Sequence, residues 1–131
     1  MSPSRLQVGV AEADITPDNP TPLAGFAARN NAPSEGVDHR LAIKAFWWSV
    51  GDDNALLVVA DILWWPPEQI DALRQQIAGR WPIPVEHIIL HATHTHSAPH
   101  PSRAFTESLG IPDDAWIEML FGRLIEVIDR A

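Results

Sequence analysis

Hydrophobic and polar residues alternate over residues 6–13, where every second residue from Leu6 to Val10 is apolar. This period of two predicts a strand, and the Asp-Ile-Thr-Pro element at residues 14–17 predicts its end in a loop. Residues 17–38 hold four prolines and two glycines without periodicity. Loops of that length are usually functional or disordered, so we expect this one to form a lid or a pocket wall.

A hairpin is predicted next. Residues 41–50 form a second apolar strand, and the turn-forming residues 51–54 join it to the apolar run 55–60. A continuous apolar run is typical of a strand that is covered on both faces. We therefore expect residues 55–60 to lie in the middle of a sheet with helices packed on both sides.

A strand–helix–strand unit follows. Two prolines precede a segment with helical spacing of apolar residues, which predicts a helix over about 67–80, and residues 85–92 form a second buried strand. Strands joined by such a helix are parallel, with a right-handed crossover. Residues 55–92 are therefore predicted to form a βαβ unit.

The chain is predicted to end in a helix over about 114–130. Asp113 or Asp114 is suited to cap its N-terminus, and its apolar face consists of Trp116, Leu120, Leu124 and Val127. A chain of 131 residues accommodates one core. The fold class is therefore α/β, with a mixed sheet in a single domain that spans residues 1–131.

The composition and net charge exclude some classes of binding partner. With 46% hydrophobic and 20% charged residues the chain is globular, and it has no apolar run long enough to span a bilayer. A net charge of −8 disfavours nucleic acid and anionic membranes. The first ten residues show no secretory leader, which predicts a cytoplasmic protein, although a secreted protein with a trimmed N-terminus has the same pattern.

Histidines give the densest chemical signal. Four of the six fall within residues 91–100, and the chain has no cysteine, so a metal needs nitrogen and oxygen ligands. In an extended chain His94 and His96 point to the same side, where both reach one zinc ion, while His91 points away. The alternative is a hydrogen-bonded surface loop. Structural roles are expected for the isolated histidines His39, His87 and His100.

Asp61 follows the predicted strand 55–60. The carboxyl ends of parallel strands meet at one edge of a sheet, so Asp61 is expected near His94. Asp61 is a candidate third metal ligand. Two alternatives stay open: its carboxylate accepts a hydrogen bond that fixes the tautomer of a histidine, or it caps the loop. Asp14 is a weaker candidate, because capping Thr16 explains it equally well.

The sequence has two tryptophan pairs, and each has two interpretations. Trp47-Trp48 and Trp64-Trp65 suit an aromatic wall for an apolar substrate, but such pairs more often place one ring in the core and one under a loop or at an interface.

Ser97 adjoins His96, and neighbours in an extended chain face opposite sides. A Ser–His nucleophile pair is therefore rejected.

Several short elements occur in a fixed order along the chain. They are Val8-Gly9-Val10, Asp14-Ile15-Thr16-Pro17, Pro22-Leu23-Ala24-Gly25-Phe26, Leu41 to Phe46, Val58-Val59-Ala60-Asp61, Ile83-Pro84 with Glu86-His87-Ile88, and Ala92-Thr93-His94-Thr95-His96-Ser97-Ala98-Pro99. In these elements the sequence resembles the N-terminal part of the neutral/alkaline non-lysosomal ceramidase family. The Thr-His-Thr-His-Ser element is the most specific of them.

The resemblance implies a zinc-dependent amidase that hydrolyses the N-acyl bond of ceramide or a related amide. It implies that His94 is a zinc ligand and that the catalytic residue His96 lines the active site. Family members complete the zinc site with a histidine, a glutamate and a tyrosine from later in a longer domain, and this sequence has no tyrosine. We therefore expect a partial domain that is inactive alone. The alternative is an inactive metal-binding or interaction module.

The implied partner is a small amide or lipid substrate. A partial sheet leaves unpaired edges and uncovered apolar surface, with the tryptophan pairs as the expected patch. Two further partners therefore stay open, a second copy of the chain and a missing C-terminal remainder of the domain.

Overall fold

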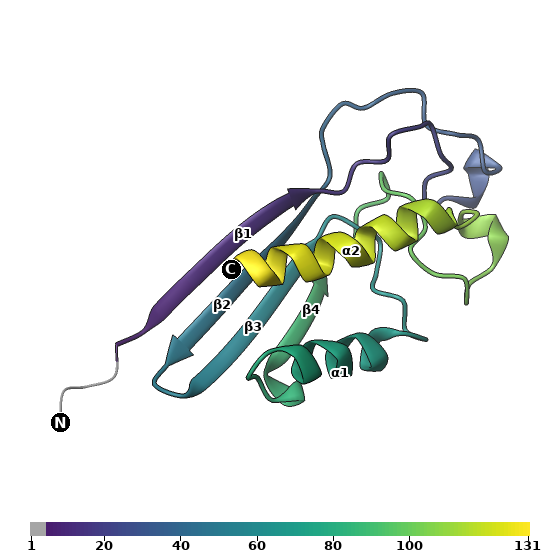
Figure 1. Cartoon of the computed structure of the whole chain (residues 1–131). Coiled ribbons are helices and arrows are strands. Elements are labelled where there is room, and N and C mark those ends of the chain that lie inside the picture. Colours follow the sequence, from purple (N-terminus) through teal and green to yellow (C-terminus); the bar gives the residue numbers. More distant parts are fainter. Residues whose placement is uncertain (1–4) are drawn as a thin grey trace.

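The computed structural model describes residues 5–131 (Figure 1). The first four residues, part of the stretch considered for a secretory leader, lie outside the described residues. The elements are β1 (Gln7–Asp14), η1 (Ala27–Arg29), β2 (Ala42–Val50), β3 (Asp53–Ala60), α1 (Ile70–Arg80), η2 (Val85–His87), β4 (Ile88–Ala92), η3 (Glu107–Leu109) and α2 (Asp114–Arg130). Within these residues no helix is both long enough and apolar enough to cross a membrane.

The four strands form one mixed sheet in the order β1-β2-β3-β4. β1 pairs antiparallel with β2, and β2 and β3 form the predicted hairpin. β3 and β4 are parallel, with α1 between them in the chain, which confirms the βαβ unit and the α/β fold class. The carboxyl ends of β3 and β4 therefore meet at one edge of the sheet.

Three boundaries of the βαβ unit differ from the prediction. β3 begins at Asp53 instead of residue 55, because Asp53 and Asn54 pair with β2, and short turns delay the other two elements. The helix begins at Ile70 instead of residue 67, since Gln69 N–H bonds the Pro66 carbonyl in a turn before it. The second strand of the unit begins at Ile88, because residues 85–87 form a 3₁₀ turn.

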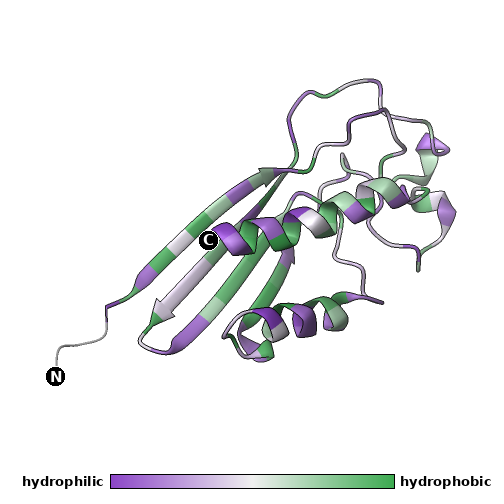
Figure 2. Cartoon of the chain, viewed as in Figure 1, coloured by the Kyte–Doolittle hydropathy of each residue, from purple (hydrophilic) through white to green (hydrophobic). Residues whose placement is uncertain are grey.

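Both helices pack on the same face of the sheet (Figure 1). The predicted N-cap of α2 is confirmed, since the Asp113 carboxylate accepts a hydrogen bond from Trp116 N–H at 3.1 Å. The predicted apolar face of α2 is buried against the strands, and Leu73 and Ile77 do the same for α1 (Figure 2). This single layer of contacts forms the core.

The opposite face of the sheet is not covered within residues 5–131. In β3 the buried residues alternate with half-buried ones, so the prediction of a strand covered on both faces is wrong. Val10 in β1 and Ile89 in β4 are 57% and 60% exposed. The paired residues Val10, Phe46, Leu57 and Ile89 run across all four strands on this side. We call it the open sheet face.

Candidate metal site at the histidine segment

After β4 the chain leaves the sheet, and the backbone of His94 adopts a left-handed conformation with φ of +62°. The expectation of an extended backbone through His94 and His96 is therefore wrong at His94. Left-handed backbone is uncommon for residues other than glycine. Such conformations persist where surrounding contacts hold them, often at functional sites.

One such contact fixes the imidazole of His94. Its Nδ1 lies 2.8 Å from the carbonyl oxygen of Leu63, in the segment that follows β3. A carbonyl only accepts hydrogen bonds, so Nδ1 donates and the lone pair of neutral His94 resides on Nε2. A donating hydrogen bond of this kind typically orients histidines that ligate metals.

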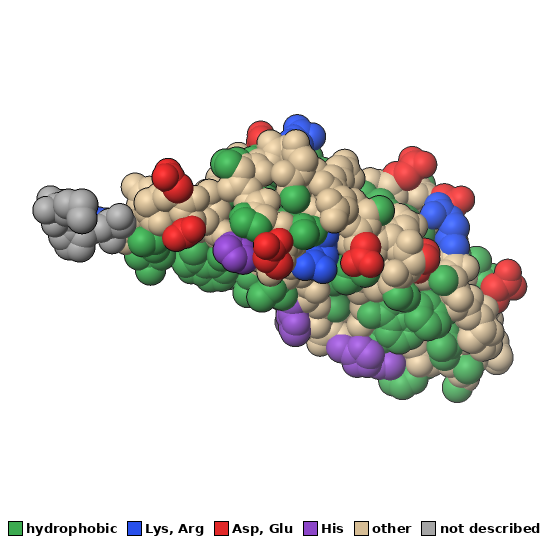
Figure 3. All heavy atoms as spheres, turned by 90° about the horizontal axis from the view of Figure 1, so that it is seen from below, with side chains coloured by type: hydrophobic (Ala, Val, Ile, Leu, Met, Phe, Trp, Pro, Cys, Tyr) green, Lys and Arg blue, Asp and Glu red, His purple; other side chains and the backbone are tan. Residues whose placement is uncertain are grey.

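The imidazole of His96 lies beside that of His94, with ring centroids 5.3 Å apart and planes nearly perpendicular. One face of His96 stacks on the ring of Phe26. Its Nδ1 is buried without a hydrogen-bond partner. The structure therefore brings the two predicted histidines together. Figure 3 shows histidine side chains at the surface beside exposed hydrophobic side chains.

Asp61 occupies the predicted edge of the sheet, but its carboxylate holds other groups. One oxygen accepts from Ala42 N–H at 2.9 Å and the other from the Thr93 hydroxyl at 3.1 Å. These bonds tie the start of β2 to the segment after β4, as a loop cap does. Ligation of a metal by Asp61 stays a prediction.

Within residues 5–131 no group of three histidine, aspartate or glutamate side chains lies close enough to hold a metal ion. The described part of the chain therefore offers two imidazoles side by side and no third ligand grouped with them. Both imidazoles are donors that suit zinc.

The other candidates have structural contacts. The Asp14 carboxylate accepts from Thr16 N–H at 2.8 Å, which is the capping alternative, and hydrogen bonding from Thr16, helped by Arg40, lowers its pKa. His39 contacts Asp38, and His87 Nδ1 lies 2.9 Å from the carbonyl of Asn54.

The second interpretation is confirmed in part: each pair divides into a ring that packs with the core and a ring outside it, but Trp48 lies on the uncovered sheet face. Trp65 is buried and donates to the carbonyl of His91 at 3.0 Å, whereas Trp64 is half-buried and packs on His94. Trp47 packs against the core, while Trp48 is half-buried on the open sheet face. Trp64 is therefore the tryptophan that borders the histidine pair.

His100 is 1% exposed, with Nδ1 accepting from Ser102 N–H, and burial lowers the pKa of this histidine. An unfolded chain has the ordinary histidine pKa of about 6.5, so below that pH the unfolded state binds more protons than the folded state. We expect the free energy of unfolding to fall as pH drops from 6.5 toward the lower folded-state pKa.

Urea unfolding measured at about pH 7 and about pH 5.5 tests this expectation. The variant His100→Gln keeps the other five histidines. It should therefore lose less stability than the wild type over that interval. Equal losses in the two proteins would contradict a buried neutral His100.

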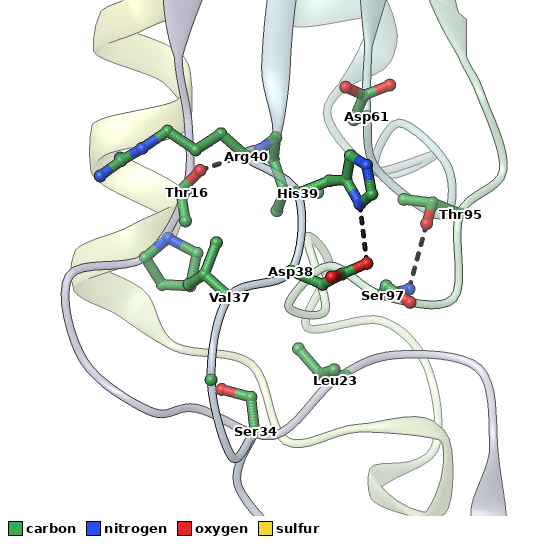
Figure 4. A pocket seen from close by; sticks show the side chains of 13 residues that line it. Thr16, Leu23, Ser34, Val37, Asp38, His39, Arg40, Asp61, Thr95 and Ser97 are labelled. Atoms are coloured by element: carbon green, nitrogen blue, oxygen red, sulfur yellow. Dashed lines mark hydrogen bonds and ion pairs between the residues drawn. The ribbon is translucent and has the colours of Figure 1, made fainter.

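The predicted pocket wall is confirmed on the other side of the histidine segment. A pocket of about 420 Å³ is lined by the long loop at Leu23, Ser34 and Val37, and by Thr95 and Ser97 (Figure 4). His94 and His96 are not among its lining residues. The alternation along residues 94–97 thus places hydroxyl side chains toward the pocket and the imidazoles elsewhere.

Comparison with solved structures identifies the fold. The chain is similar to a crystal structure of neutral ceramidase from Pseudomonas aeruginosa, with a TM-score of 0.79 and 21% identity. It is equally similar to a ceramidase complexed with C2, at 20% identity and the same TM-score. Each match covers 98% of this chain, which confirms the fold that the resemblance implies. No protein-family model matches the sequence, and neither does any curated protein.

This chain spans about one fifth of each of those solved chains, since the matches cover 21% of their length. The shared part includes nearly all of the elements described above. Sequence reasoning left three residues beside His96 without a role, namely Gly25, Phe26 and Arg29. The Pro22-Leu23-Ala24-Gly25-Phe26 element was a signal for Gly25 and Phe26, because it belongs to the resemblance, whereas Arg29 lies outside every such element.

Proposed function

We propose that residues 1–131 form the histidine-bearing part of a zinc-dependent amide hydrolase of the neutral ceramidase family. The observation that carries the proposal is the hydrogen bond from His94 Nδ1 to Leu63, which leaves Nε2 available beside the imidazole of His96. The fold shared with two ceramidase structures supports it.

His94 and His96 are the residues that would hold zinc, with Asp61 as a candidate third ligand. Bound zinc lowers the pKa of a water ligand to about 7 and polarises the carbonyl of an amide. The role of His94 is ligation, oriented by Leu63. His96 has one open ring nitrogen, Nε2, which would either ligate zinc beside His94 or, without the metal on it, donate a hydrogen bond to the developing oxyanion or move a proton. The substrate class is ceramide or a related N-acyl amide.

The second candidate is a metal-binding or interaction module without turnover. The observation that favours it is that no third metal-ligating side chain is grouped with the two histidines in residues 5–131. Both candidates bind the metal. They differ in whether the site takes part in catalysis, which in the first candidate requires residues beyond this sequence.

Calorimetric titration with zinc at neutral pH tests the shared part of both candidates. We expect one weak site, because two or three protein ligands bind zinc less tightly than the four of structural sites. The double variant His94→Ala, His96→Ala should lose it. The matched control is His39→Ala, His87→Ala, which removes two histidines elsewhere and should bind as the wild type does. Binding that survives in the first variant would overturn the proposed site.

A further inference from the structure

The loop between β1 and β2 encloses the imidazole of His96. The ring of Phe26 stacks on it with centroids 4.4 Å apart and an interplanar angle of 27°. The guanidinium of Arg29 lies 4.9 Å from the centre of the Phe26 ring. Arg29 Nη1 also donates to the carbonyl oxygen of His96 at 2.6 Å. One arginine thus contacts both the backbone of His96 and the ring stacked on it.

Gly25 lies close to Nδ1 of the same imidazole. A Cβ atom at this position would lie 2.1 Å from Nδ1 of His96, and the backbone φ of +97° is one that other residues rarely adopt. Gly25 N–H bonds the carbonyl of Leu109, and Ala24 N–H bonds that of Ala98, so the loop is anchored on both sides. The imidazole therefore lies against backbone that cannot easily retreat.

These contacts define which atom of His96 faces outward. Nδ1 is buried without a partner against Gly25, and only that ring nitrogen of His96 is buried in this way. Nε2 is then the nitrogen that remains open to a metal or a substrate. A neutral imidazole with Nε2 presented in a fixed direction is suited to either role.

We propose that Phe26 and Arg29 are positioning residues that hold the His96 imidazole with Nε2 directed out of the protein. Phe26 fixes the plane of the ring, and Arg29 fixes both Phe26 and the backbone that carries the ring. This inference rests on the proposed function, in which His96 is a metal-site residue. Neither Phe26 nor Arg29 supplies an atom to the metal or to the reaction.

The first measurement uses the metal-free protein. A stacked phenyl ring shifts the ring-proton resonances of His96 upfield, so Phe26→Leu should remove that shift. Arg29→Gln should reduce it, because the ring pair becomes mobile, and Arg29→Lys should restore part of it. The ring protons of His87, in the η2 turn at the opposite end of β4, serve as the internal reference. Unchanged His96 resonances in all three variants would overturn the proposal.

The second measurement is the affinity for zinc, with Co²⁺ absorption spectra as a report on ligand geometry. Residues that orient a metal ligand typically contribute 10- to 100-fold in affinity, so we expect the Kd to rise about tenfold in Phe26→Leu and Arg29→Gln. Arg80→Gln removes an arginine that lies over another aromatic ring, Trp81, at 5.1 Å. Together with Phe46→Leu on the open sheet face, it is the matched control and should bind as the wild type does.

The outcomes separate the two claims. If the wild type binds zinc and the Phe26 and Arg29 variants bind like the controls with unchanged spectra, the positioning role is wrong and the metal site stands. If the wild type binds no zinc but the His96 ring protons respond to both substitutions, the metal site is wrong and the positioning role stands. Thermal unfolding of each variant identifies any loss that comes from the fold.

Discussion

Residues 1–131 loaded with zinc should not hydrolyse a fluorescent N-acyl sphingosine. The rate of hydrolysis should equal the rate measured in buffer that contains zinc but no protein. A catalytic zinc needs about three protein ligands and an open position, and the transition state needs preorganised donors around the oxyanion. The described residues bring together two imidazoles and no third ligand. The ligand set that the resemblance implies includes a tyrosine, which the sequence lacks.

The assay compares this chain with a full-length neutral ceramidase at equal zinc concentration. The ceramidase is the positive control, and His94→Ala in the present chain is the negative one. If the short chain hydrolyses the substrate and His94→Ala abolishes this activity, the two histidines and their surroundings are sufficient for catalysis. The expectation of an incomplete site would then be wrong.

The isolated chain should associate through the open sheet face. Four strands at the usual spacing of about 4.8 Å present roughly 500 Å² on one side, near the upper limit of apolar patches on monomers. Val10 and Ile89 at the two edges are more than half exposed, and Glu12 and Lys44 pair with each other on the same face. Asp14 on this face pairs with Arg40, and Asp53 at the hairpin end adds one negative charge, so little net charge opposes contact between two copies. Sedimentation velocity at increasing concentration should show a rising average mass.

The double variant Val10→Lys, Ile89→Lys should sediment as a monomer, because two added charges on each copy repel across any such contact. Val37→Lys is the matched control, since Val37 is 59% exposed but lies in the long loop away from the sheet. A wild type that stays monomeric and binds no dye for apolar surfaces would contradict the prediction.

Local sequence patterns accounted for most of the secondary structure. The helical spacing of Trp116, Leu120 and Leu124, with an aspartate before it, specifies a capped amphipathic helix without reference to the rest of the chain. The turn cluster between β2 and β3 specifies the hairpin in the same way. These features depend on neighbours within a few residues, which a sequence displays directly.

The open sheet face could not be predicted because an apolar run does not say what covers it. Leu57 and Val59 are as apolar as Leu56 and Val58, yet only the second pair faces the helices. Buried and half-buried residues alternate along β3 because α1 and α2 both pack on one face of the sheet. Neither helix reveals its side of the sheet through its own sequence.

The histidine pair was found by spacing, but its geometry was not. The left-handed backbone of His94 occurs together with a contact of its side chain with Leu63, 31 residues earlier in the chain. The contact of Arg29 with His96 joins residues 67 positions apart. Long-range contacts of this kind depend on the complete fold, so a pattern of nearby residues does not contain them.

The enclosure of His96 by the β1–β2 loop has a consequence for the order of folding. Contacts between residues distant in sequence form late, because closing a long loop costs entropy before any contact forms. The β2–β3 hairpin is local, whereas the surroundings of His96 require the first third of the chain to meet residues 94–98. Metal affinity should therefore appear last during refolding, and zinc, by binding only the completed state, should slow the first step of unfolding.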